Sequence, residues 1–77
     1  MTEEPEITEA YSRVVSFLIE TRHKRGLTQT QLGEMLAKPQ SYIAKYELLT
    51  RRLDVVEFME ICEALGLRPS KVMVLAQ

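Results

Sequence analysis

Apolar residues recur at three- and four-residue intervals along most of the chain, which is the spacing of amphipathic α-helices. Between Thr8 and Gly26 they form a single stripe, made of Tyr11, Val14, Val15, Leu18 and Ile19. Thr8 is suited to cap the start of a helix, and Gly26 follows a basic last turn and is suited to end it. The pattern therefore predicts a first helix from Thr8 to about Arg25.

Two short helices are predicted next, with almost nothing between them. Thr28 can cap a helix over residues 29–37, whose apolar positions are Leu32, Met35 and Leu36. Pro39 cannot continue that helix but can begin another, because the N–H that proline lacks would have no partner in a first helical turn. The helix over residues 39–48 would turn Ile43 and Tyr46 inward, and its outward residues would be Gln40, Ser41, Ala44 and Lys45.

The rest of the chain predicts a fourth helix and a short fifth one. Asp54 can cap the fourth, which ends before Gly66 and whose predicted inward residues are Val55, Phe58, Met59, Cys62 and Leu65. Pro69 opens the fifth helix, from Ser70 to about Leu75. No strand signal of convincing length occurs, so the sequence predicts an all-α domain over residues 8–77. Residues 1–7 predict a disordered acidic tail.

Composition excludes most other classes of protein. The chain has 77 residues, enough for one domain with a small core. No apolar run approaches the ~20 residues needed to cross a bilayer, and no signal-peptide pattern precedes the first helix. We therefore expect a cytoplasmic protein with no membrane partner.

The chain also lacks the residues that catalysis or metal binding usually requires. It has one cysteine and one histidine, too few for a metal site, and its three glycines are too scattered for a phosphate-binding loop. Cys62 lies on an apolar stripe and is interpreted as a small buried hydrophobe rather than a redox sensor. We expect no enzyme, no catalytic residues, no cofactor, no metal and no small-molecule ligand.

Charge is divided unevenly along the chain. The formal net charge is −1. Residues 21–52 contain seven basic and two acidic side chains, a local balance of +5, whereas residues 1–9 and 54–63 contain four acidic residues each and no basic one. Because fields beyond ~8–10 Å are screened at physiological salt, the local sign matters more than the total for binding a polyanion. The middle of the chain is therefore suited to nucleic acid.

Two helices that cross steeply, the second with small and amide side chains outward, have a shape that fits the major groove of DNA. Gln40 can form two hydrogen bonds to adenine, and the Ser41 hydroxyl can hydrogen-bond to more than one kind of base. Ala44 is small enough to touch a thymine methyl, and Lys45 can reach guanine or a phosphate. The alternative is that these four residues form an ordinary solvated helix face.

Two runs of residues resemble the Cro/phage-repressor (Xre-type) helix-turn-helix family. They are Arg22-x-x-Arg25-Gly26-Leu27-Thr28-Gln29-x-x-Leu32-Gly33 and Gln40-Ser41-Tyr42-Ile43-Ala44-Lys45-Tyr46-Glu47. The similarity continues through Phe58 and Ala64-Leu65-Gly66 and covers about residues 10–75. It implies a compact five-helix lambda-repressor-like domain and a sequence-specific transcriptional regulator of double-stranded DNA, in particular a repressor. It also implies a bacterial or phage-encoded protein associated with the nucleoid.

The resemblance assigns supporting roles as well. The residues expected to contact phosphate are Gln29, Tyr42, Thr50, Arg51 and Arg52. Gln29 would use the free N–H groups at a helix N-terminus, and Tyr42 could instead cover the junction of the two helices. Arg22 and Glu47 match a pair that forms a largely buried salt bridge in the family. This salt bridge would hold in place the recognition helix, which is the helix predicted over residues 39–48.

Several residues depart from the family pattern. Ala37 stands where a turn glycine is common, Pro39 where a hydroxyl residue is common, and Gly33 where alanine is common. Leu48 and Leu49 stand where a polar residue and a glycine are usual. Either the third helix continues further, or these leucines bury against the fourth helix or a second subunit.

A single helix-turn-helix unit reads few base pairs, so we expect a homodimer on an inverted-repeat operator. The possible dimer interface consists of Leu48, Leu49, Met73 and Leu75. The competing hypothesis is a protein-interaction or antitoxin-like module that kept the fold but binds DNA weakly or not at all. The overall acidity and the two leucines favour this alternative.

Overall fold

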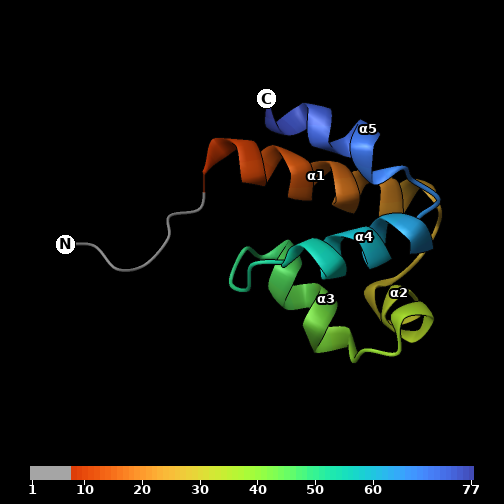
Figure 1. Ribbon diagram of the computed structural model, residues 1–77. Helices are drawn as coiled ribbons and strands as arrows, with labels where there is room; N and C mark the ends of the chain where they lie inside the picture. The colour runs from red at the N-terminus through yellow and green to blue at the C-terminus, as the bar shows by residue number, and fades with distance from the viewer. Residues whose placement is uncertain (1–7) are drawn as a thin grey trace.

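The computed structural model describes residues 8–77, which are helical and contain no strand. The acidic tail expected over residues 1–7 lies outside the described residues. The helices are α1 Glu9–Lys24, α2 Gln29–Leu36, α3 Gln40–Glu47, α4 Val55–Ala64 and α5 Pro69–Met73, followed by the 3₁₀ turn η1 Val74–Ala76. In Figure 1, α4 lies between α1 on one side and the α2–α3 pair on the other, and α5 packs beside α1. The predicted all-α, five-helix fold is confirmed.

Side-chain caps fix where three of the helices begin. The hydroxyl of Thr8 accepts from the amide of Tyr11 at 3.1 Å. Thr28 and Gln31 form a full capping box at the start of α2, in which each side chain accepts from the other residue's backbone N–H. Asp54 forms the same arrangement with Glu57 at the start of α4. Each cap satisfies backbone donors that would otherwise have no partner, which is worth ~1 kcal/mol per helix.

Four helices end in the same way. At each end a residue with positive φ donates to the carbonyl three residues back, and the next residue donates to the carbonyl five residues back. Gly26 and Gly66 occupy this left-handed position after α1 and α4, as the sequence predicted for Gly26. Ala37 (φ 58°) and Leu49 (φ 65°) occupy it after α2 and α3. These two residues hold a conformation that costs an L-residue about 1–2 kcal/mol, and the paired hydrogen bonds offset that cost.

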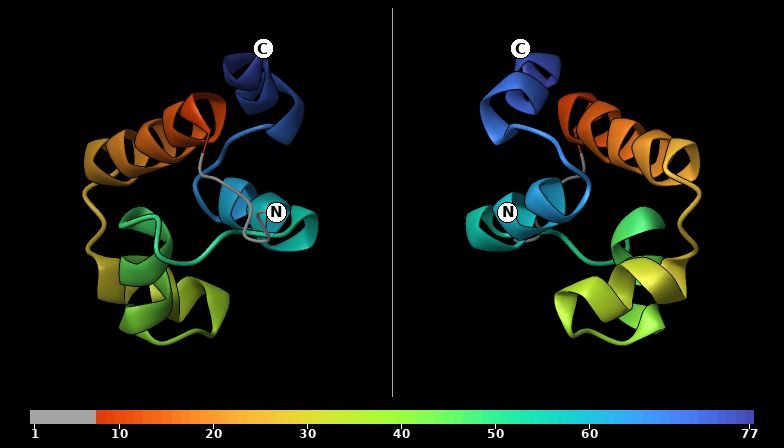
Figure 2. Two further views of the ribbon diagram at one scale, coloured as in Figure 1. Left: turned by 90° about the vertical axis from the view of Figure 1, so that its left-hand side faces the viewer. Right: turned by 90° about the vertical axis from the view of Figure 1, so that its right-hand side faces the viewer.

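The core is built from all five helices: α1 packs on α3 and α5, and α4 packs on α2 and α5. Of the predicted inward residues of α1 and α3, Val14, Val15, Leu18, Ile43 and Tyr46 are buried. The other two, Tyr11 and Ile19, are half-buried against the core. Figure 2 shows α1 and α5 packed at one end of the molecule and α2 and α3 at the other. The remaining fully buried side chains are Leu32, Ile61, Cys62, Leu65 and Val72. Burial raises the pKa of the Cys62 thiol to about 11, which keeps it protonated and unreactive.

The predicted inward face of α4 is partly wrong. Val55 and Met59 are 72% and 50% exposed, whereas Ile61, which the prediction omitted, is completely buried. The buried stripe is Phe58, Ile61, Cys62 and Leu65, so the helix is rotated toward Ile61. Because α4 carries apolar residues on both faces, periodicity alone allows either rotation. Met35 in α2 was also predicted on the apolar face and is 55% exposed.

The two leucines after α3 differ in their exposure to solvent. The helix stops at Glu47, so it does not continue through them. Leu49 is half-buried and packs against the core, whereas Leu48 is 71% exposed. Burial of Leu49 accounts for a leucine at a left-handed position, because a glycine there would lose the apolar contact.

Candidate nucleic-acid interface

The turn between α2 and α3 brings two backbone segments into close contact. A Cβ atom on Gly33 would lie 2.6 Å from the carbonyl oxygen of Lys38 and 3.4 Å from that of Pro39. The Lys38 amide donates to the Gly33 carbonyl at 2.8 Å, which closes the turn. Gly33 is therefore not a neutral replacement for alanine: its missing side chain lets α3 start directly against α2.

The outer face of α3 has the composition that the sequence predicted. Gln40, Ser41 and Lys45 are exposed, and Ala44 is half-buried between them. Pro39 is the N-cap rather than the first helical residue, and no side chain caps this end. The first turn of α3 therefore leaves backbone N–H groups open to a ligand, next to the side chains of Gln40 and Ser41.

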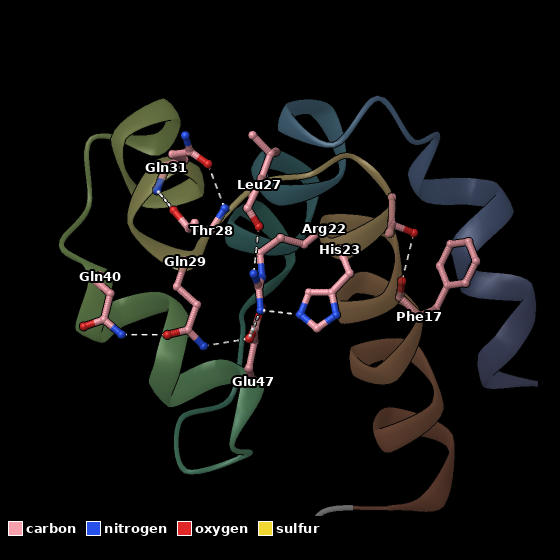
Figure 3. Close-up of polar contacts among 10 residues, drawn as sticks. Phe17, Arg22, His23, Leu27, Thr28, Gln29, Gln31, Gln40 and Glu47 are labelled. Carbon is pink, nitrogen blue, oxygen red and sulfur yellow. Dashed lines mark hydrogen bonds and ion pairs between the residues drawn. The ribbon is translucent and has the colours of Figure 1, made fainter.

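A network of side chains leads inward from this face (Figure 3), and we call it the polar network. The Nε2 group of Gln40 donates to Oε1 of Gln29 at 2.6 Å. The Nε2 group of Gln29 donates to Oε1 of Glu47 at 2.8 Å. Arg22 completes the network with two bonds to the Glu47 carboxylate, of 2.7 Å from Nε and 3.0 Å from Nη2. Residues from α1, α2 and α3 are thus joined through one carboxylate.

The Arg22–Glu47 pair lies almost entirely out of solvent. The two side chains are 8% and 6% exposed. Arg22 also donates through Nη1 to the Leu27 carbonyl at 2.8 Å, and its Nη2 lies 3.1 Å from Nε2 of His23. Guanidinium has no acceptor, so His23 must accept there with its proton on Nδ1. His23 is thus exposed but has a partner in Arg22.

Glu47 sets the direction of every amide in the network. An ionised carboxylate can only accept, so Gln29 must turn its NH₂ group toward Glu47 and its oxygen toward Gln40. Gln40 must then present its own NH₂ group to Gln29. What remains on Gln40 is one N–H and the carbonyl oxygen, both at the exposed start of α3. Gln29 keeps one further N–H at the start of α2.

A second cluster lies at the other side of α3, around Tyr42. This residue is only 9% exposed, and its ring lies edge-on to the ring of Tyr46, with centroids 6.3 Å apart. The Arg51 guanidinium lies 4.9 Å from the Tyr42 ring centroid, and the Lys38 ammonium lies 5.2 Å from it. Burial, followed by the charge of Glu57, raises the pKa of Tyr42, so its hydroxyl remains a donor. The ring covers the helix junction, and two cations lie over it.

Arg51 is also held by Glu57, a partner that the sequence does not predict. Two hydrogen bonds of 3.1 and 2.7 Å join the guanidinium to the carboxylate. These bonds and the cap contact with Asp54 lower the pKa of Glu57. The pattern Asp-x-x-Glu at residues 54–57 predicts the capping box, but the pairing with Arg51 depends on the path of the loop.

The other predicted contact residues lie nearby. The Thr50 hydroxyl donates to the Lys45 carbonyl at 3.0 Å, so its oxygen keeps free lone pairs. The Arg52 guanidinium lies 5.0 Å from the centroid of the Tyr11 ring, at the side of α1. Of the four possible dimer residues, Leu48 and Met73 are exposed, while Leu49 and Leu75 are half-buried against the core. Met73 lines a groove of about 260 Å³ together with Leu53, Val55 and Phe58.

Two structural features are absent from residues 8–77. None of their helices is long and apolar enough to cross a membrane. No group of three or more potential metal-ligating side chains occurs among them.

A tight two-helix turn whose second helix presents amide, hydroxyl and amine groups outward defines a helix-turn-helix DNA-binding unit. The helix-turn-helix family model HTH_3 matches residues 18–72. A solved structure described as an XRE-family like protein from Pseudomonas syringae pv. tomato str. DC3000 matches with a TM-score of 0.82 and 37% identity, over 87% of this chain and 82% of that chain. No match was found among curated proteins. The chain belongs to the Cro/phage-repressor (Xre-type) helix-turn-helix family, whose members are regulatory DNA-binding proteins.

Proposed function

We propose that the chain is a transcriptional repressor that binds an inverted-repeat operator as a homodimer, with α3 of each subunit in a major groove. The observation that carries this proposal is the polar network, because it holds Gln40 in one orientation. A reader of bases gains affinity and specificity when its side chain is fixed before binding. Gln40 keeps the one donor and one acceptor that bidentate pairing with adenine needs.

The neighbouring residues of α3 would read the adjoining bases. Ser41 and Lys45 are exposed, and Ala44 leaves room for a thymine methyl. Contacts to phosphate would come from Gln29, Thr50, Arg51 and Arg52, with Tyr42 supporting Arg51 from below. Such contacts set affinity and register rather than sequence choice.

Arg51 has a particular place in this scheme. Its charge is shared with Glu57, so its attraction for a phosphate is reduced until the DNA backbone competes with the carboxylate. Arg51 would then mainly shape the surface beside the groove.

The dimer would form through the apolar residues at the far end of α3 and the C-terminus. Leu48 is 71% exposed and Met73 50%, so a second subunit could cover both side chains. Light scattering across a micromolar concentration series, with and without DNA, tests this arrangement. A monomer at every concentration and in the DNA complex would rule out the dimer.

Selection of bound sites from random duplex DNA tests the function directly, and two substitutions assign the roles of the side chains. Gln40→Ala should cost about 1–3 kcal/mol at its own base position and relax sequence choice there. Arg52→Ala should weaken all sites about equally and reduce the salt slope of log K by ~0.9. Lys71→Ala, an exposed basic residue on α5, is the matched control and should change neither.

The same experiment separates the repressor from the alternative of a protein-interaction module. Binding that selects no sequence, or that hardly depends on salt, contradicts the proposal. Unchanged site selection by the Gln40→Ala variant would mean that α3 is not the reader.

A further inference from the structure

Helix α4 has a second face that the core does not use. Val56, Met59, Glu60 and Glu63 follow one another at helical spacing on the side away from the buried stripe. Val56 is 62% exposed and Met59 50% exposed. An ordinary solvated helix face would carry polar residues at these positions, so two large apolar side chains there need an explanation.

Two open grooves flank this face and extend it beyond α4. One, of about 310 Å³, is lined by Met35 and Leu36 of α2 together with Glu60, Glu63 and Ala64. The other, of about 490 Å³, lies between α4 and the segment that leads into α5, and its lining includes Val56, Met59, Leu67 and Arg68. Glu60 and Glu63 line both grooves and form the ridge between them. We call this area the α4 surface: Met35, Val56, Met59, Glu60, Glu63 and Leu67.

The charge of the α4 surface has one sign. The polar residues of α4 are all glutamates, and Glu57 is already paired with Arg51. Within residues 8–77 the ion pairs are Arg22–Glu47 and Arg51–Glu57, so neither Glu60 nor Glu63 is neutralised in this way. Among the described residues that line either groove, Arg68 is the one cation, and it lines only the larger groove. The surface therefore combines exposed apolar side chains with uncompensated negative charge.

The geometry points to a docking site for a basic amphipathic helix of a partner protein, with apolar side chains in the two grooves and Lys or Arg against the Glu60–Glu63 ridge. Charge complementarity selects this occupant. A second copy of the chain would place each acidic ridge against its own equivalent across a two-fold axis, where like charges repel. DNA is repelled for the same reason.

The α4 surface and the proposed DNA face share only α2, which contributes Met35 near its end to the first and Gln29 at its start to the second. In the left view of Figure 2, α4 lies on the right of the molecule and α3 on the lower left. A partner helix on α4 would thus leave Gln40 and Lys45 exposed. The partner would reach the regulator without displacing it from DNA.

A designed peptide can test the site without knowledge of the natural partner. The probe is an amphipathic helix of about 18 residues, ~27 Å long, with leucines on one face and lysines beside them. Its counterpart has every lysine replaced by glutamate. Each is titrated into ¹⁵N-labelled protein that also carries ¹³C-methyl methionine. The lysine peptide should shift the methyls of Met35 and Met59 and the amides of Val56, Glu60 and Glu63 saturably, and the glutamate peptide should not.

Charge reversal then locates the contact. Glu63→Lys should lower the affinity for the lysine peptide by about three- to tenfold, because an attraction becomes a repulsion. Glu20→Lys, an exposed glutamate on α1, makes the same change in net charge and should leave the affinity unchanged. Equal binding of both peptides, or equal effects of the two variants, would overturn the proposal. Chemical-shift changes confined to α3 would also overturn it. So would changes at the α4 surface that grow with protein concentration when no peptide is present, because they would indicate self-association.

Discussion

Replacing Glu47 with alanine is expected to lower the free energy of unfolding by about 3–5 kcal/mol. The change leaves the Arg22 guanidinium with the Leu27 carbonyl and the His23 ring as its protein partners, in a place where its side chain is 8% exposed. A buried cation without its carboxylate loses the interaction that compensates its desolvation. Gln29 loses its acceptor in the same step. Urea denaturation followed by circular dichroism measures the loss.

Two further variants separate charge from packing at this site. Glu47→Gln keeps the shape and an acceptor oxygen but removes the negative charge. Its free energy of unfolding should therefore lie between those of the wild type and the Glu47→Ala variant. Arg22→Met combined with Glu47→Leu removes both charges and should cost less than Glu47→Ala alone, because no charge is stranded. A loss below about 1 kcal/mol for Glu47→Ala would mean that the pair behaves as a solvated surface pair.

The size of this effect has a consequence for function. A loss of about 3–5 kcal/mol is a large part of the stability of a small domain. DNA binding by Glu47→Ala therefore has to be measured under conditions that keep the chain folded, such as low temperature with a stabilising osmolyte. Glu47→Gln is the better probe of the polar network. It changes the orientation imposed on Gln29 and Gln40 while α3 stays attached to α1.

The sequence contained enough to place the helices and most of the recognition face. Thr8, Thr28 and Asp54 cap as predicted, and the apolar stripes of α1 and α3 are buried. These predictions succeed because caps and stripes are local: they depend on residues within about two turns of each other. The family match confirms the fold class and the helix-turn-helix itself.

The failures occur where tertiary contacts decide between local alternatives. Helix α4 has apolar residues on two faces, and only packing selects Ile61 over Val55 and Met59. Ala37 and Leu49 both end helices in a conformation that their residue type disfavours, because the paired hydrogen bonds and, for Leu49, core contact compensate. No spacing rule connects Arg51 to Glu57 across a loop.

The contacts of Gln29 illustrate the same limit at the site. Its position at a helix N-terminus is local information, and the prediction of a phosphate contact rests on that position. Its bonds to Gln40 and Glu47 span 11 and 18 residues of sequence, and they give the side chain a second role as a support for α3. A role that depends on two other helices cannot be inferred from spacing within one.

Gly33→Ala should destabilise the domain by about 1–2 kcal/mol, although alanine is the better helix former. Helix propensity favours the change by up to about 1 kcal/mol. The new Cβ would lie 2.6 Å from the Lys38 carbonyl oxygen, which is backbone and can move only if the turn and the start of α3 move with it. Overpacking of this kind costs about 1–3 kcal/mol, so the clash outweighs the propensity. Thermal unfolding measures the result, with ~4–8 °C expected per kcal/mol in a domain of this size.

Ala37→Gly is the matched control, because it lies in the same turn and changes the same pair of residue types in the opposite direction. Ala37 holds φ 58°, which costs about 1–2 kcal/mol for alanine. Glycine removes this strain but lowers the stability by about 0.5–1 kcal/mol, because it raises the conformational entropy of the unfolded chain. The expected net gain in the free energy of unfolding is therefore about 0.5–1 kcal/mol.

The amide resonances of Lys38 and Gln40 should move in Gly33→Ala, and DNA affinity should fall as well because Gln40 would leave its position beside Gln29. An alanine at position 33 that leaves stability and these resonances unchanged would mean that the turn shifts freely. The close crossing of α2 and α3 would then not be what positions the reading helix.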